Sequence, residues 1–273
     1  MLNTITSMDT LEMKYIQLTY YDLALAISLL ILAAIVLRRE RLGLVKDLLW
    51  GSIRAFVQLS AVGLALKWIF ATHNPLPVAG FFLLIIAAAT LTAGRRQKPR
   101  LPQSHLLLAG AIMTGVVPVL AIAILLIIRP EPFWQGQYLL PLAGMTTAGA
   151  MNAANLTLNR LASEMKSKQH EIEAVLALGL GPQSAVRTLS RHVAQAALIP
   201  TMNALLAVGI VQLPGMMSGQ ILAGVPPVAA VRYQIVIMFM LTAAPVLTTA
   251  VTIHWATGRY FTKREQLRYE LVA

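Results

Sequence analysis

The chain has 273 residues, of which 57% are hydrophobic and only 12% are charged, and its mean hydropathy is +0.68. Soluble domains are about 45–50% apolar and about 25% charged, so this composition excludes a water-soluble enzyme and predicts an integral membrane protein. The chain has no cysteine, which excludes disulfides, thiolate metal sites and cysteine nucleophiles.

Seven runs of the chain are long and apolar enough to cross a bilayer, whose core is about 30 Å thick and needs about 20 residues of helix. The fifth and sixth are the richest in small and polar residues. We therefore predict an all-α polytopic membrane protein with one transmembrane domain over residues 21–258, a short extracytoplasmic segment at 1–20 and a cytoplasmic tail at 259–273. The predicted spans are 21–37, 48–70, 78–94, 106–128, 138–158, 194–213 and 234–257.

The basic residues orient these spans. Seventeen of the 22 lysines and arginines follow the first, third, fifth and seventh spans or lie in the loop after the fifth. Under the positive-inside rule this places the amino terminus outside and the carboxyl terminus in the cytoplasm. The first 20 residues lack a basic n-region and a small-residue cleavage site, so the first span is predicted to be a signal anchor. The net charge of +11 then meets anionic lipid headgroups, and no nucleic-acid partner is expected.

The second span carries three polar residues, Asp47, Arg54 and Gln58, within about 40° of one another on a helix. An arginine inside the hydrocarbon costs several kcal/mol unless it snorkels, pairs or faces water. Arg54 therefore either reaches the inner headgroups or forms, with Gln58, a polar face toward a translocation path or a subunit contact. Asp47 is its candidate partner.

The fifth span combines small residues with side chains that bind metal ions. Gly144, Ala148 and Asn152 stand four apart, which lets helices approach closely. Met145, Asn152 and Asn155 share a broad face and offer thioether and amide ligands, which do not select one metal. They are candidate translocation-path residues. The alternative is helix packing joined by amide hydrogen bonds.

The one long aqueous segment, residues 159–192, is predicted to be a cytoplasmic helix–turn–helix. Its first half has apolar residues at helical spacing. Gly179 suits the end of that helix and Pro182 the start of the next. Glu173 and Ala174, followed by Gly179, resemble the loop of ABC-transporter permeases that docks into the ATPase, although the Leu-Pro pair of that motif stands further along here, at 199–200. The candidate ATPase-coupling residues are Glu173, Ala174, Gly179 and Pro182.

This loop also has a simpler interpretation, a membrane-surface hairpin that only connects two spans. The chain has no Gly-x-x-x-x-Gly-Lys-Ser/Thr sequence, so any ATP that drives it is hydrolysed by a separate polypeptide.

The segment after the sixth span is too apolar for an ordinary loop and too interrupted by glycine and proline for a helix. Such backbone survives near a membrane where protein or a water-filled cavity covers it, so we expect an outer gate or re-entrant turn, or else an interfacial packing turn. Ser218 and His254 also raise the hypothesis of an intramembrane serine protease, but no Gly-x-Ser-x-Gly elbow is present. The candidate gate residues are Pro214, Gly215, Met216, Met217, Ser218, Gly219, Tyr233 and Gln234.

These stretches resemble the FetB-type permease family, the membrane subunits of bacterial iron-exporting ABC transporters, which also includes plant permeases linked to aluminium tolerance. The similarity runs over roughly residues 20–265. It is carried by Arg54-x-x-x-Gln58-Leu59, Pro141-x-Ala143-Gly144-Met145, Leu178-Gly179-x-x-Pro182, the block 196–200 and the long blocks 213–219 and 223–235.

The resemblance implies a complex of two permeases and two separate ATP-binding subunits in the bacterial inner membrane. It also implies export of a metal ion, chiefly iron, with a contribution to resistance against oxidative stress. ATP and Mg²⁺ belong to the partner subunit, no cofactor is expected on this chain, and the metal ligands stay unknown. The alternative from another class is an ATP-independent channel or secondary transporter for a small ion. Inverted repeats would favour that alternative, and none is visible in the sequence.

Overall fold

The computed structural model describes residues 19–72, 74–96, 101 and 103–272, and these residues form helices and no strand. The predicted all-α polytopic membrane fold is thereby confirmed, whereas the predicted segment 1–20 lies almost wholly outside the described residues. Each predicted span falls on a helix. These helices are α1 (Tyr20–Arg39), α2 (Val45–Ala71), α3 (Pro75–Arg96), α4 (Ser104–Ile122) with the π-helix η1 (Ala123–Ile128), α5 (Gly136–Ser167), α8 (Arg187–Ala207) and α10 (Pro227–Thr257).

Five helices of the described chain are long and apolar enough to cross a membrane, namely α1, α2, α3, α4 with η1, and α10. Helices α5 and α8 are also long enough, but their threonine, asparagine, glutamine and glycine residues lower their mean hydropathy. The count of seven spans and the orientation of the termini therefore stay predictions.

The chain divides into two compact units. Helices α1 and α2 form the first unit, and most residues in them are exposed, including many leucines, isoleucines and valines. Helices that expose apolar side chains along their whole length suit lipid surroundings. The second unit contains the helices from α3 to α10 and the end of the chain, except for Leu222–Gly224 at the end of α9, which group with the first unit.

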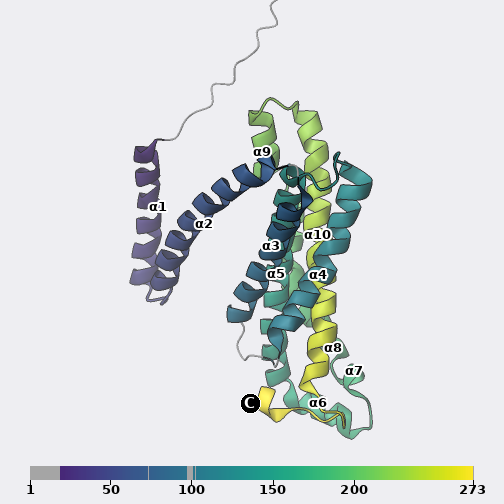
Figure 1. Ribbon diagram of the computed structural model, residues 1–273. Coiled ribbons are helices and arrows are strands. Elements are labelled where there is room, and N and C mark those ends of the chain that lie inside the picture. Colours follow the sequence, from purple (N-terminus) through teal and green to yellow (C-terminus); the bar gives the residue numbers. More distant parts are fainter. Residues whose placement is uncertain (1–18, 73, 97–100, 102, 273) are drawn as a thin grey trace, which may run out of the picture. The chain divides into compact units, whose positions relative to one another are not determined.

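The second unit is a bundle in which α10 packs against α4, α5 and α8, and α3 packs against α4 and α5 (Figure 1). Two glycines bring α10 close to its neighbours. A Cβ added at Gly149 of α5 would lie 3.3 Å from Pro245 Cγ, and one added at Gly115 of α4 would lie 2.8 Å from the carbonyl oxygen of Ala244. Small residues thus set the helix spacing, as is usual in membrane bundles.

A helix–turn–helix is present as predicted, but its first helix begins at Gln169, because residues 159–167 continue α5. It consists of α6 (Gln169–Ala177) and α7 (Pro182–Ala185), which lie at one end of the bundle beside the carboxyl terminus (Figure 1). Gly179 has φ +81°, a left-handed conformation that suits glycine at the end of a helix. Pro182 occupies the first turn of α7, where its missing N–H costs nothing.

Part of the expectation for the segment after the sixth span was wrong. Residues Gly215–Leu222 form a helix, α9, because the prolines of this segment stand outside it and only two glycines interrupt it. The amide of Ser218 donates to the carbonyl of Pro214 at 3.1 Å, which starts the first turn. Helix α8 ends at Ala207, six residues before the predicted end of the sixth span.

Candidate functional site

A cavity of about 350 Å³ lies within the second unit, between α5, α8, α9 and α10. Its lining combines thioether, amide and hydroxyl groups with apolar side chains. The structure brings together here six residues that the sequence placed in two separate groups, the translocation path and the outer gate. They are Met145, Asn152, Pro214, Gly215, Met216 and Gln234.

Gln234 is the most buried polar residue that lines this cavity. Its side chain is only 6% exposed, and its Oε1 atom has no hydrogen-bond partner among the described residues. A buried amide oxygen without a partner costs about 1–3 kcal/mol, so this position favours a bound water or ligand. Sequence reasoning missed two other lining residues, Gln212 and Met238, although Gln212 stands two positions before Pro214 and Met238 one helical turn after Gln234.

The other candidate path and gate residues do not line this cavity. Asn155 accepts a hydrogen bond from Asn159 Nδ2 at 3.1 Å, within α5 itself. Arg54 and Gln58 are exposed on α2, in the first unit, and Arg54 makes no ion pair with Asp47 or with another described residue. The remaining gate residues outside the lining are Met217, Ser218, Gly219 and Tyr233.

The serine-protease hypothesis is wrong. The Ser218 hydroxyl donates to the carbonyl oxygen of Pro214 at 3.2 Å. His254 lies near the other end of α10, in the wall of a different cavity with Pro182 and Phe261. Helix α9 and this end of α10 stand at opposite ends of the bundle (Figure 1), so the two side chains cannot exchange a proton.

The four candidate coupling residues are grouped at the far end of the bundle, around α6 and the turn that follows it. The Glu173 carboxylate accepts a hydrogen bond from Gln169 Nε2 at 3.0 Å and lies 3.7 Å from His170 Nδ1. Hydrogen bonds from Gln169 and from the Tyr269 hydroxyl hold the pKa of Glu173 below its ordinary value. The same bond to Glu173 raises the pKa of Tyr269.

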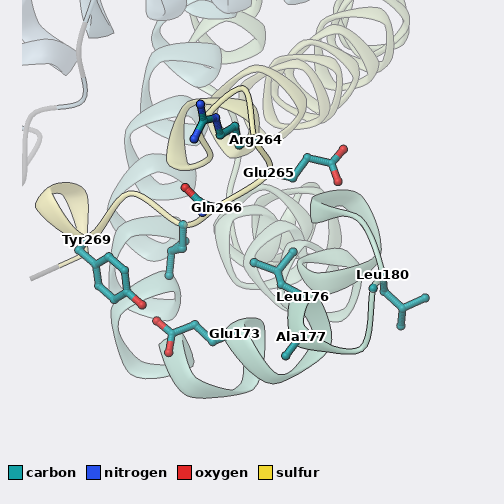
Figure 2. A pocket seen from close by; sticks show the side chains of 10 residues that line it. Glu173, Leu176, Ala177, Leu180, Arg264, Glu265, Gln266 and Tyr269 are labelled. Carbon is teal, nitrogen blue, oxygen red and sulfur yellow. The ribbon is translucent and has the colours of Figure 1, made fainter.

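Tyr269 belongs to the segment that was predicted only as a tail. Residues 258–272, which we call the C-terminal strap, fold back against α6. Figure 2 shows Tyr269, Gln266, Glu265 and Arg264 of the strap across from Glu173 and Leu176 of α6. The signal in the sequence was the apolar series Tyr260, Phe261, Leu267, Leu271 and Val272, which a solvated tail does not need.

Comparison with known proteins connects these features to a family. The sequence profile of the uncharacterised protein family UPF0014 matches residues 20–261. The chain is 35% identical to the UPF0014 membrane protein slr1647 of Synechocystis, over 94% of this chain and 99% of that protein. It is 36% identical to the probable iron export permease protein FetB of Escherichia coli, over 92% and 95%.

A plant protein is also similar. The chain is 29% identical to the protein ALUMINUM SENSITIVE 3 of Arabidopsis thaliana, over 90% of this chain and 88% of that protein. No solved structure matches the chain.

Proposed function

Because the chain belongs to the UPF0014 family, we propose that it is the membrane permease subunit of an ABC transporter that exports iron or another metal ion. A separate subunit binds ATP and Mg²⁺ and hydrolyses the nucleotide. Two copies of each subunit form the complex, in the bacterial inner membrane. The similarity to a protein named as a probable iron export permease supports the cargo.

The observation that carries the proposal is the connection between α6 and the cavity. Ile172 of α6 is buried in one core with residues of α5, α8 and α10. The same three helices line the cavity further along the bundle. A displacement of α6 by a partner is therefore transmitted to the cavity walls through packed side chains, as a hinge or shear movement.

The cavity lining suits a transition-metal cargo. Met145, Met216 and Met238 offer thioether sulfur, and Asn152, Gln212 and Gln234 offer amide groups. Thioethers favour soft metal ions, whereas amide oxygens favour harder ones. A mixed set of this kind does not select one metal, so the cargo is proposed from the similarity to a probable iron export permease.

The test is reconstitution of this chain with the ABC ATP-binding subunit in proteoliposomes. We expect Fe²⁺ to stimulate ATP hydrolysis and ATP to drive Fe²⁺ movement across the membrane. Other divalent and monovalent cations, supplied in the same assay, define the selectivity. Iron movement through this chain alone, without the ATPase and without ATP, would instead establish the channel or secondary-transporter alternative.

A matched pair of variants on α10 connects the activity to the cavity. Gln234→Leu removes the buried amide, and we expect it to lower iron transport about tenfold, because a hydrogen bond or ion–dipole contact to a charged group contributes about 1.5–3 kcal/mol. Phe239 is exposed and outside the cavity lining, so Phe239→Leu is expected to transport normally. Equal transport by the two variants would show that the cavity is not part of the cargo path.

A further inference from the structure

The C-terminal strap is a folded part of the bundle's end. Tyr260 and Val272 are almost completely buried, and Phe261 and Leu267 are 6% and 5% exposed. All four share a hydrophobic core with Ile172 of α6. The strap and α6 therefore form one packed body.

Backbone hydrogen bonds give the strap a defined shape. The Arg268 amide donates to the Tyr260 carbonyl at 2.8 Å, and the Thr262 amide donates to the Gln266 carbonyl at 2.8 Å. Phe261 and Leu267 form an antiparallel bridge. These bonds close a small hairpin that is set before any partner binds.

A groove of about 580 Å³ lies between the strap and α6 with its following turn (Figure 2). Leu180 and Tyr269 line it and are 50% and 59% exposed. Arg264 also lines it, and its guanidinium makes no ion pair with another described residue. The groove thus combines apolar side chains with the unpaired positive charge of Arg264 and the carboxylates of Glu173 and Glu265.

With α5 crossing the bilayer at the predicted span, the length of this helix separates the groove from the bilayer. The helix has 32 residues and is about 48 Å long, whereas the hydrocarbon needs about 30 Å. The part beyond the predicted span carries Arg160, Glu164 and Lys166 and adds about 14 Å before α6 begins. Leu180 and Tyr269 thus lie together beyond the predicted span, where a docked protein would cover them.

We propose that this groove is a docking site for a segment of the ATP-binding partner subunit, so that the strap and the α6 turn together form the ATPase contact. This proposal rests on the proposed function. The end of the bundle, residues 159–192 and 258–272, carries nine basic and five acidic side chains, so the docking segment of the partner carries a carboxylate that pairs with Arg264 and an apolar side chain that packs on Leu180.

The strap also provides a second mechanical route from the partner to the cavity. It continues directly from α10, and α10 contributes Gln234 and Met238 to the cavity lining. A partner that holds both the α6 turn and the strap acts on two cavity-lining helices at once, since α6 follows α5 and the strap follows α10.

The decisive test compares charge reversal at two neighbouring residues of the strap. Arg264 lines the groove, whereas Lys263 is exposed outside it. The full-length chain is purified in mild detergent, the bound protein is identified by mass as an ABC ATP-binding subunit, and its affinity for each variant is measured. We expect Arg264→Glu to weaken binding about tenfold or more, as loss of a partnered interface charge does, and Lys263→Glu to change it less than about twofold.

The outcomes separate the two proposals. Absence of an ABC ATPase from the wild-type complex would refute the proposed function itself. An ATPase that binds Arg264→Glu and Lys263→Glu equally well would leave that function standing and overturn the groove as its docking site.

A labelling experiment tests lipid as the covering material. The chain has no native cysteine, so a fluorophore attached to Leu180→Cys reports on one position. In lipid nanodiscs we expect quenching by a water-soluble quencher, and protection from it when the ATPase binds. Quenching by a lipid-borne quencher, unchanged by the ATPase, would show that the groove lies on the membrane and would overturn the proposal.

Discussion

At the scale of single residues, the turn after α6 depends on the backbone of one glycine. Gly179 has φ +81°, whereas Gly181, two residues later, has φ −70°. A Cβ added at Gly179 would meet no atom within 4 Å, and one at Gly181 would meet only Glu265 Oε2, at 3.9 Å. The two glycines therefore have similar space and different backbone requirements.

We predict that Gly179→Ala impairs coupling and that Gly181→Ala does not. A left-handed conformation costs an alanine about 1–2 kcal/mol, so the turn shifts and α6 no longer moves as one body with the bundle. The measurement is the number of ions transported per ATP hydrolysed in proteoliposomes, with membrane insertion checked separately. A fall with Gly179→Ala, at normal insertion and with Gly181→Ala at wild-type level, is the expected result. Equal ratios for both variants would contradict it.

The contact between Tyr269 and Glu173 predicts a pH dependence. Hydrogen bonds from Gln169 and Tyr269 lower the pKa of Glu173 from its ordinary value of 4.5. A lowered carboxyl pKa stabilises the folded contact above pH 4.5, and this stabilisation is lost as the pH falls through the lowered pKa. Attachment of the strap to α6 is thus expected to be constant near neutral pH and to weaken only in acid.

Tyr269→Phe tests this contact without changing the size of the ring. Loss of the hydroxyl removes one of the bonds that lower the pKa of Glu173, so the titration of Glu173 moves upward. Nuclear magnetic resonance of chains labelled at glutamate carboxyl carbons measures this shift, and the other glutamate signals are the internal control. An unchanged Glu173 titration would mean that the tyrosine does not hold the carboxylate in the membrane-embedded protein.

At the scale of elements, α4 approaches α10 closely at Gly115. A Cβ at Gly115 would collide with Thr248 Oγ1 and with the backbone oxygen of Ala244. Gly80 of α3 is the matched control, since a Cβ there would meet no atom within 4 Å. We predict that Gly115→Ala destabilises the protein by about 1–3 kcal/mol, the usual cost of overpacking, and that Gly80→Ala does not. Thermal unfolding in detergent measures both, and equal midpoints would contradict the prediction.

The elements also show what the sequence could and could not predict. Long apolar runs predicted every major helix, because the thickness of the bilayer sets their length. Gly179 and Pro182 predicted the break between α6 and α7, because both residues act through local backbone conformation. Helix α9 was not predicted, because Pro214 and Gly215 suggested a break in the helix, although the seven residues that follow them are helical.

The sequence could predict single residues of the site, but it could not predict that they come together. Met145 and Gln234 were each singled out from their own segments, but only tertiary packing shows that α5 and α10 bring them to one cavity. The strap was missed for the same reason. Leu267 and Val272 are core residues through contacts with α6, nearly 100 positions earlier in the chain.

At the scale of the whole molecule, the proposed homodimer needs a surface at which two bundles meet. Helix α5 buries one face and leaves Ala148 and Asn152 exposed and Gly144 half-exposed on another. Small residues four apart allow two helices to approach closely in a membrane. Since Asn152 also lines the cavity, a dimer formed at this face would place the two cavities on either side of the α5 pair.

We therefore predict that Ala148→Cys forms a disulfide-linked dimer on mild oxidation in native membranes. A disulfide requires the two Cα atoms to stand about 4.4–6.8 Å apart, which only a close helix pair achieves, and the chain has no other cysteine to compete. Val117→Cys is the control, because Val117 is 41% exposed on α4, away from the α5 face. Efficient cross-linking at Val117→Cys and none at Ala148→Cys would contradict this prediction. The dimer contact would then lie on α4, and the exposed residues of α5 would face lipid.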